Sequence, residues 1–175
     1  MYEIEPIIND VWQMTVRSYE AEGVKQDCLF LQERYGVGVS AWFALLSLAV
    51  LGYRLCDESS LTAVLSRAET WQNEVIKPLR SARKAARLEQ GSVDEMDAVA
   101  AARKRLLAEE IAAEAIQQRL LITDYRAHTQ LTTPADDEAL LSLASDYIGL
   151  YASQPDEADQ AAIKRVVAAF ADQRS

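Results

Sequence analysis

The sequence predicts an all-α protein, built as a bundle of about five helices with two further helices at its C-terminal end. Apolar residues recur with helical spacing almost throughout the 175 residues, and no segment alternates with the two-residue period of a strand for long enough to form one. Half of the residues are hydrophobic, while only six are Gly and four are Pro. A chain of this length and composition buries a core as one domain and has few residues that interrupt helices.

Three helices are expected in the first third of the chain. The first should end before Gly23, and the second should end at Gly36, because glycine readily takes the left-handed conformation that closes many helices. Ser40 is placed to cap a third helix, which is apolar nearly all round and should therefore lie at the centre of the bundle. The first helix is identified by one apolar stripe, which consists of Ile8, Val11, Trp12, Thr15 and Tyr19.

The fourth and fifth helices should form a long antiparallel hairpin. One apolar stripe continues over 61–86, and because proline disrupts the preceding helical turn, a kink or a break is expected just before Pro78. A tight reversal then leads into a capping box, in which Ser92 and Glu95 satisfy the first amides of an alanine-rich helix over 93–128. Two helices joined by so short a turn pack side by side.

The C-terminal part predicts two shorter amphipathic helices, over 135–153 and 156–174, each preceded by a break that contains proline. We expect a single domain over 1–175. Within it, 1–131 forms the main bundle, and 134–175 forms a helical pair that could be an appendage to it.

Composition and charge exclude several classes of protein. The net charge of −9 and the isoelectric point of about 4.7 argue against general nucleic-acid binding. Two cysteines cannot form a disulfide framework, and the first ten residues carry acidic but no basic side chains, unlike a signal peptide. The uncharged stretch between Arg34 and Arg54 begins with a turn, which leaves too short a helix to cross a membrane. A cytoplasmic protein is therefore expected, and an integral membrane protein is not.

The common enzyme motifs are missing from the sequence. The single histidine, His128, cannot supply a histidine metal site, and no phosphate-binding loop or nucleophile elbow is present. Neither Cys28 nor Cys56 has a basic neighbour that would lower its pKa. The acidic run 136–138 could hold Mg²⁺, but it also stands where a helix N-terminus favours negative charge. We assign no catalytic residue, metal or cofactor, and the sequence favours a protein that is not an enzyme.

Charge is distributed very unevenly along the chain. The segment 77–105 holds 8 basic and 4 acidic residues, whereas the rest of the chain holds 10 and 23. This basic surface is either a solvated helix face that pairs with nearby acids, or a docking surface for an acidic protein or another anionic ligand. It is too short to predict binding of double-stranded nucleic acid. Its candidate binding residues are Lys77, Arg80, Arg83, Lys84 and Arg87, with Arg103 on the facing helix.

Three charged residues fall on the apolar stripe of the fifth helix. Arg103, Glu110 and Glu114 should therefore be partly buried, and buried charges need partners. The hairpin geometry places Arg67 near the two glutamates, and Arg80 or Arg83 near Arg103 or another acid. The group is either a structural ion-pair network or part of a polar pocket. The candidate pocket residues are Gln32, Trp42, Trp71, Arg103, Glu110 and Glu114.

Over about residues 20–122 the chain resembles a small bacterial family that is known only as a domain of unknown function. The resemblance implies an all-helical, cytoplasmic bacterial protein and brings no activity with it. The chain departs from the family pattern at Ser40 and Leu107. The residues that carry the resemblance are Cys28-Leu29-Phe30-Leu31-Gln32, Gly36, Val39, Leu45-Leu46 and Gly52, followed by Trp71, Val75 and Pro78-Leu79-Arg80 with Arg83 and Lys84.

These observations leave three functions open. The sequence favours a non-catalytic interaction or adaptor protein, whose basic surface on the fourth and fifth helices docks an anionic partner. The alternative is a small-molecule-binding protein or enzyme, with a polar pocket between helices two to five. A further alternative is a peripheral binder of anionic membranes. A homo-oligomer is compatible with each of them.

Overall fold

Helices account for nearly all of the regular structure in the computed structural model, which describes residues 4–56, 60–87 and 90–174. The all-α class is therefore confirmed. The helices are α1 (Ile4–Glu20), α2 (Val24–Tyr35), α3 (Val39–Val50), α4 (Ser60–Trp71), the π-helical η1 (Gln72–Ile76), α5 (Lys77–Ala85), α6 (Val93–Ala127), α7 (Asp137–Gly149) and α8 (Glu157–Ala171), and the strands are β1 (Tyr53–Leu55) and β2 (Thr129–Leu131).

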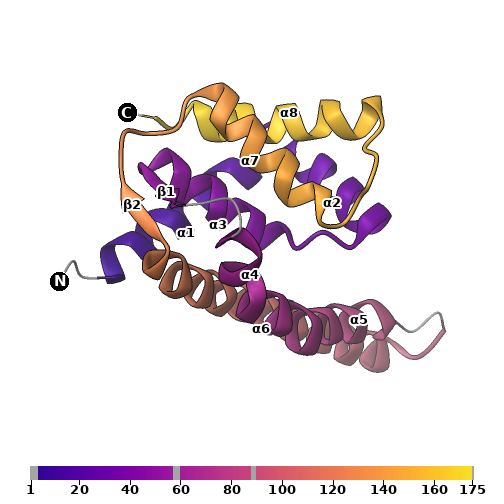
Figure 1. Ribbon diagram of the computed structural model, residues 1–175. Helices are drawn as coiled ribbons and strands as arrows, with labels where there is room; N and C mark the ends of the chain where they lie inside the picture. Colours follow the sequence, from indigo (N-terminus) through magenta and orange to yellow (C-terminus); the bar gives the residue numbers. More distant parts are fainter. Residues whose placement is uncertain (1–3, 57–59, 88–89, 175) are drawn as a thin grey trace.

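The central helix of the molecule is α3, as its apolar sequence predicts. Every residue from Ser40 to Val50 is buried. The C-terminal helices pack on it (Figure 1): the ring of Trp42 is stacked on Tyr147 of α7, and Phe43 meets Phe170 of α8 edge to face with ring centroids 4.9 Å apart. Among the described residues, no helix is long and apolar enough to cross a membrane.

The predicted fourth helix is divided into three parts, α4, η1 and α5. Pro78 lies in the first turn of α5, directly after the π-helical segment. Because proline has no N–H and its ring collides with the carbonyl four residues earlier, a regular α-helix cannot continue through this position, and a wider turn relieves the conflict. The irregularity expected just before Pro78 is a π-helical turn in an uninterrupted helical run, not a break, and the number and limits of the helices differ from the expectation.

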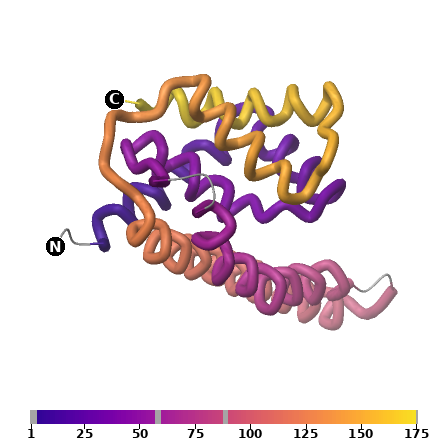
Figure 2. The backbone as a smooth tube through the Cα atoms, viewed as in Figure 1, coloured from indigo at the N-terminus to yellow at the C-terminus, as the bar shows by residue number. Residues whose placement is uncertain are grey.

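The long helix α6 runs antiparallel to α4 and α5, and the far end of this hairpin extends beyond the other helices (Figures 1 and 2). Its N-terminus has the predicted capping box of Ser92 and Glu95. The predicted register was wrong in one place. Arg67 does not reach the glutamates of α6, and its Nη1 instead donates to Asp124 at 2.8 Å. In an antiparallel pair, each residue by which the turn moves shifts every facing residue by two, so an error in the expected position of the turn changes the neighbours.

A short antiparallel ladder joins the end of α3 to the end of α6, and the sequence did not predict it. Strands β1 and β2 pair Tyr53 with Leu131 and Arg54 with Gln130. Three-residue strands are too short to show a two-residue period, which is the signal that identifies strands in a sequence. The turn before β1 requires glycine, because Gly52 has φ of +87° and a Cβ would lie 2.6 Å from the Thr132 carbonyl oxygen.

Candidate functional site

A cleft of about 540 Å³ separates the N-terminal helices from the α5–α6 hairpin. Helices α1, α2 and α3 form one side, and α5 and α6 form the other. Both polar and apolar side chains line it: Trp12, Thr15, Val16, Tyr19, Glu20, Lys25, Cys28, Leu29, Gln32, Val39, Ser40, Phe43, Arg80, Arg83, Leu107, Glu110, Ile111 and Glu114. Two of the charges predicted to be buried, Glu110 and Glu114, contribute to this lining.

Two arginines of α5 meet two glutamates of α6 at this cleft. Arg80 donates from Nε to Glu110 at 2.7 Å and from Nη2 to Glu114 at 3.0 Å. Arg83 donates from Nε to the second oxygen of Glu110 at 2.6 Å. The spacing explains the geometry, because residues three or four apart lie on the same face of a helix. Because all four side chains line the cleft, this ion-pair network forms part of its wall.

The two glutamates differ in their electrostatics. Burial alone would raise the pKa of Glu110, whose side chain is 5% exposed, but hydrogen bonds from Arg83 and Arg80 outweigh burial and hold the pKa below its usual value. Burial raises the pKa of Glu114 to about 7. The nearby Glu110 charge acts in the same direction, and the attraction of Arg80 and Arg83 does not compensate for the lost solvation. Near neutral pH, Glu110 is ionised and Glu114 exchanges between its two states.

Apolar side chains dominate the rest of the cleft. Leu29 on α2 and Leu107 and Ile111 on α6 are exposed, although they are large and hydrophobic. The aromatic rings of Trp12 and Tyr19 add to this surface from α1. Exposed apolar side chains gathered around a few polar groups are typical of ligand-binding sites. The cleft is thus amphipathic, with a charged wall and apolar surroundings.

The titratable groups of the cleft are suited to binding rather than to nucleophilic catalysis. Burial and, to a lesser extent, the charge of Asp27 raise the pKa of the Cys28 thiol, so the reactive thiolate is scarce at neutral pH. Burial likewise raises the pKa of Tyr19. The carboxyl of Glu114, whose pKa is about 7, contacts Arg80 rather than a nucleophile.

Of the predicted pocket residues, Gln32, Glu110 and Glu114 line the cleft, whereas Trp42 and Trp71 do not. Trp42 is fully buried in the core. The indole of Trp71 donates to the carbonyl of Ala113 at 2.9 Å, which joins α4 to α6. Helical spacing placed both tryptophans on inward faces, but it does not distinguish the core from a cleft.

Arg103 is also absent from the cleft lining, and it holds the end of α5. Its Nη1 donates to the carbonyls of Arg83 at 2.9 Å and of Ala86 at 3.0 Å. The last turn of any helix leaves its carbonyls without amide partners from the same helix, and these two carbonyls lie at that end. Arg103 thus supplies the missing donors.

The predicted basic surface is divided by these interactions. Arg80 and Arg83 face the glutamates of the cleft, and Lys77 donates to Asn73 at 2.7 Å. Lys84 and Arg87 are exposed, and among the described residues they have no ion-pair partner. The positive charge available to a partner is therefore smaller than the sequence count indicates.

The acidic run 136–138 acts at a helix N-terminus. The side chain of Asp136 accepts a hydrogen bond from the amide of Ala139 at 2.9 Å and caps α7. No group of three or more metal-ligating side chains is found among residues 4–56, 60–87 and 90–174.

Sequence reasoning missed the apolar lining of the cleft. Trp12 and Tyr19 belong to the apolar stripe predicted for the first helix, and Leu107 and Ile111 have the spacing of the apolar stripe of the fifth. A stripe shows which face of a helix is apolar, but it does not show whether another helix covers that face. Here the cleft leaves parts of both stripes open to solvent.

Comparison with known proteins adds a family to this geometry. No curated protein and no solved structure matches the chain. A family model matches residues 10–121, a range that contains every residue lining the cleft but not α7 or α8. The match covers more than half of the chain. The chain therefore belongs to the family described as "Protein of unknown function (DUF2390)".

Proposed function

We propose that the protein binds a small amphipathic molecule in the cleft, with an anionic group at the arginines and an apolar body along α1, α2 and α6. The observation that supports this most strongly is the juxtaposition of the Arg80–Arg83 pair with exposed apolar side chains, among them Leu107 and Ile111. A carboxylate on an aliphatic chain is the simplest molecule with both properties.

The charges of the cleft favour an anion. Two guanidinium groups face Glu110, which is ionised, and Glu114, which is partly neutral near pH 7. The Nη1 atoms of Arg80 and Arg83 donate to no residue that the structure describes. When Glu114 is protonated, the group has one excess positive charge and free donors. A carboxylate satisfies both, because guanidinium groups bind it with charge-assisted hydrogen bonds.

The apolar lining favours a hydrocarbon body. Burial of exposed apolar side chains releases water and contributes roughly 25 cal/mol for each Å² removed from solvent. A cleft of about 540 Å³ is large enough for a small molecule of this kind. The family match includes the whole cleft, so the proposal concerns the part of the chain that defines the family.

Calorimetry with three ten-carbon ligands tests the charge requirement. We expect decanoate to bind more tightly than decanol, and decylammonium to bind weakest, because only decanoate complements the guanidinium groups. Arg83→Gln should weaken decanoate binding by about tenfold and leave decanol binding nearly unchanged. Arg105→Gln, an exposed arginine of α6 outside the cleft, is the matched control. Equal affinity for the three ligands would contradict the proposal.

A second candidate is the interaction protein that the sequence favours. The supporting observation is the exposed group of Lys84, Arg87, Lys104 and Arg105 on the extended hairpin. Binding of a polyglutamate peptide should fall with salt, and should be lost when Lys84 and Arg87 are replaced by Glu. Replacing Arg17 and Lys164 by Glu makes the same change of charge on α1 and α8. If both double variants weaken binding equally, the effect is one of net charge and this candidate is wrong.

A further inference from the structure

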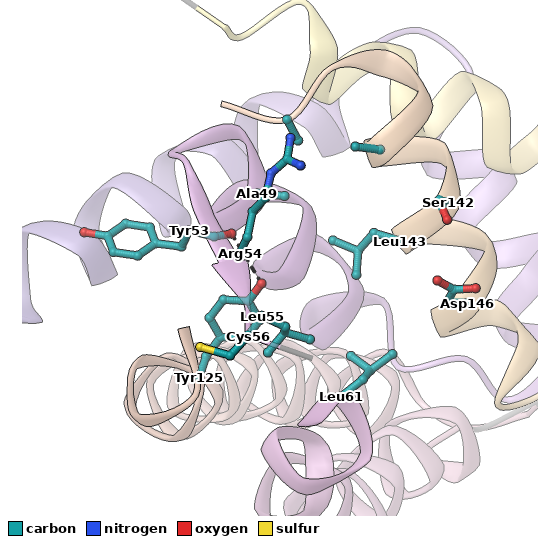
Figure 3. Close-up of a pocket in the computed structure, with 12 residues that line it drawn as sticks. Ala49, Tyr53, Arg54, Leu55, Cys56, Leu61, Tyr125, Ser142, Leu143 and Asp146 are labelled. Carbon is teal, nitrogen blue, oxygen red and sulfur yellow. Dashed lines mark hydrogen bonds between the residues drawn. The ribbon is translucent and has the colours of Figure 1, made fainter. Parts of the chain in front are cut away.

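A second cavity lies where the end of α3 and the strand β1 face α7 (Figure 3). Its volume is about 560 Å³, and it shares no lining residue with the cleft. Helix α7 turns one face toward it, with Ala139, Ser142, Leu143 and Asp146 spaced three or four residues apart. Because α7 lies outside the residues matched by the family model, this cavity belongs only in part to the family region.

The cavity has opposite charges on two of its walls. In Figure 3, Arg54 of β1 and Asp146 of α7 lie on different sides, with Leu143 between them. The two side chains form no ion pair with each other, and neither pairs with another residue that the structure describes. In the cleft, by contrast, both arginines are paired with carboxylates. A cation and an anion are thus available to a ligand here.

The remaining walls are mainly apolar and well fixed. Leu61 of α4 and Leu143 contribute aliphatic surface, and the hydroxyl of Tyr125 donates to the carbonyl of Tyr53 at 3.4 Å. Strand β1 is held by its ladder with β2, in which Arg54 is opposite Gln130. Arg54 therefore projects from an ordered backbone, so that binding of a ligand has to order its side chain but not the strand.

We propose that this cavity is a second binding site, for a short peptide with free ends. Arg54 would take the terminal carboxylate and Asp146 the terminal ammonium, while Leu61 and Leu143 contact an apolar side chain between them. A dipeptide has this distribution of charge, because its two charged ends are separated by a largely uncharged body. A dianion or a dication would place one charge against a like charge of the cavity.

Binding of the dipeptide alanyl-leucine, measured by calorimetry, tests this assignment. We expect its N-acetyl derivative and its C-terminal amide each to bind at least about tenfold more weakly, because each loses one charged end. Arg54→Gln should weaken binding of the dipeptide but have little further effect on binding of the amide, which has already lost the carboxylate. Asp146→Asn should weaken binding of the dipeptide but have little further effect on binding of the N-acetyl derivative, which has already lost the ammonium. Arg17→Gln and Asp10→Asn, both exposed on α1, are matched controls. If no dipeptide binds, or if the capped forms bind as well, the proposal is wrong.

Cys56 provides a second measurement, which locates the bound peptide. This exposed cysteine lines the cavity, whereas the only other cysteine, Cys28, is buried. A bound dipeptide should slow alkylation of Cys56, and decanoate should not. Binding without protection would place the peptide elsewhere and overturn the proposal. Because decanoate and dipeptide are measured separately, failure of this site leaves the cleft proposal standing, and the reverse also holds.

Discussion

Two glutamates one turn apart on α6 show how strongly a residue depends on its immediate contacts. Glu110 accepts hydrogen bonds from two arginines, and its pKa is lowered despite burial. Glu114 accepts from Arg80 alone, and burial raises its pKa to about 7. The same residue type is thus a fixed negative charge at one position and a titrating group at the next turn.

This difference predicts that Glu114 makes stability dependent on pH. Its pKa in the folded protein, about 7, is above the value of about 4.5 expected for the unfolded chain, so the folded state holds the proton more tightly. The stabilisation is complete below about pH 4.5 and is lost as the pH rises to about 7. Relative to Glu114→Gln, the wild-type protein should lose roughly 2 kcal/mol of unfolding free energy over this interval. Urea unfolding at a series of pH values measures it.

The control for this prediction is Glu109→Gln, which changes an exposed glutamate on the same helix. It should leave the pH dependence of the wild-type protein intact. If Glu114→Gln has the same pH dependence as the wild type between about pH 4.5 and 7, then Glu114 is not the titrating group.

At the scale of residues, the sequence indicated which charges are buried but not all of their partners. The positions of Glu110 and Glu114 follow from the period of one helix, which is local information. The contact of Arg67 with Asp124 depends on the register between α4 and α6, and that register is set by the whole length of the hairpin. Local patterns carry no signal of such a distant constraint.

The helices show the same division between local and distant causes. One capping box, glycine stops and apolar stripes predicted most of them, since each signal lies within the helix or at its end. The π-helical segment was anticipated only as a disturbance before Pro78. The β1–β2 ladder was missed, because it forms between segments that the chain brings together only through α4, α5 and α6.

The turn into β1 should tolerate no side chain. In Gly52→Ala, the new Cβ meets the Thr132 carbonyl oxygen at 2.6 Å and the backbone keeps a positive φ of +87°. We expect a loss of about 2–3 kcal/mol of unfolding free energy. Gly36→Ala is the matched control, since Gly36 also has positive φ but no atom within 4 Å of its Cβ position, and it should cost only about 1 kcal/mol. Thermal or urea unfolding measures both, and equal losses would contradict the steric argument.

Arg103 should stabilise the end of α5 rather than the whole fold. Arg103→Gln removes the donors to the carbonyls of Arg83 and Ala86. Amide hydrogen exchange in the last turn of α5 should quicken by about tenfold, while exchange in α3 stays unchanged. Arg105→Gln, at an exposed position two residues away, serves as the control. Unchanged exchange in α5 would show that these hydrogen bonds do not hold the helix end.

At the scale of the whole molecule, the cleft results from how the helices are arranged. The apolar stripe of α6 is covered by α1 and α3 where Gln118 bonds to Thr15 and to the Ser40 carbonyl. Nearer the N-terminus of α6 the stripe lines the cleft, and Leu107 and Ile111 stay exposed there. No single helix specifies this transition. It could not be predicted from periodicity, because a stripe looks the same whether it is covered or open.

The most direct test of the central claim compares two isoleucines of α6. Ile111 and Ile116 are both 44% exposed, but only Ile111 lines the cleft. Because both side chains are exposed, replacing either isoleucine by Glu should leave the fold intact. The dissociation constant of decanoate should rise by at least about tenfold in Ile111→Glu, since a charge is placed against the hydrocarbon body, and should stay unchanged in Ile116→Glu. Equal effects of the two substitutions, or none, would show that the cleft is not the binding site.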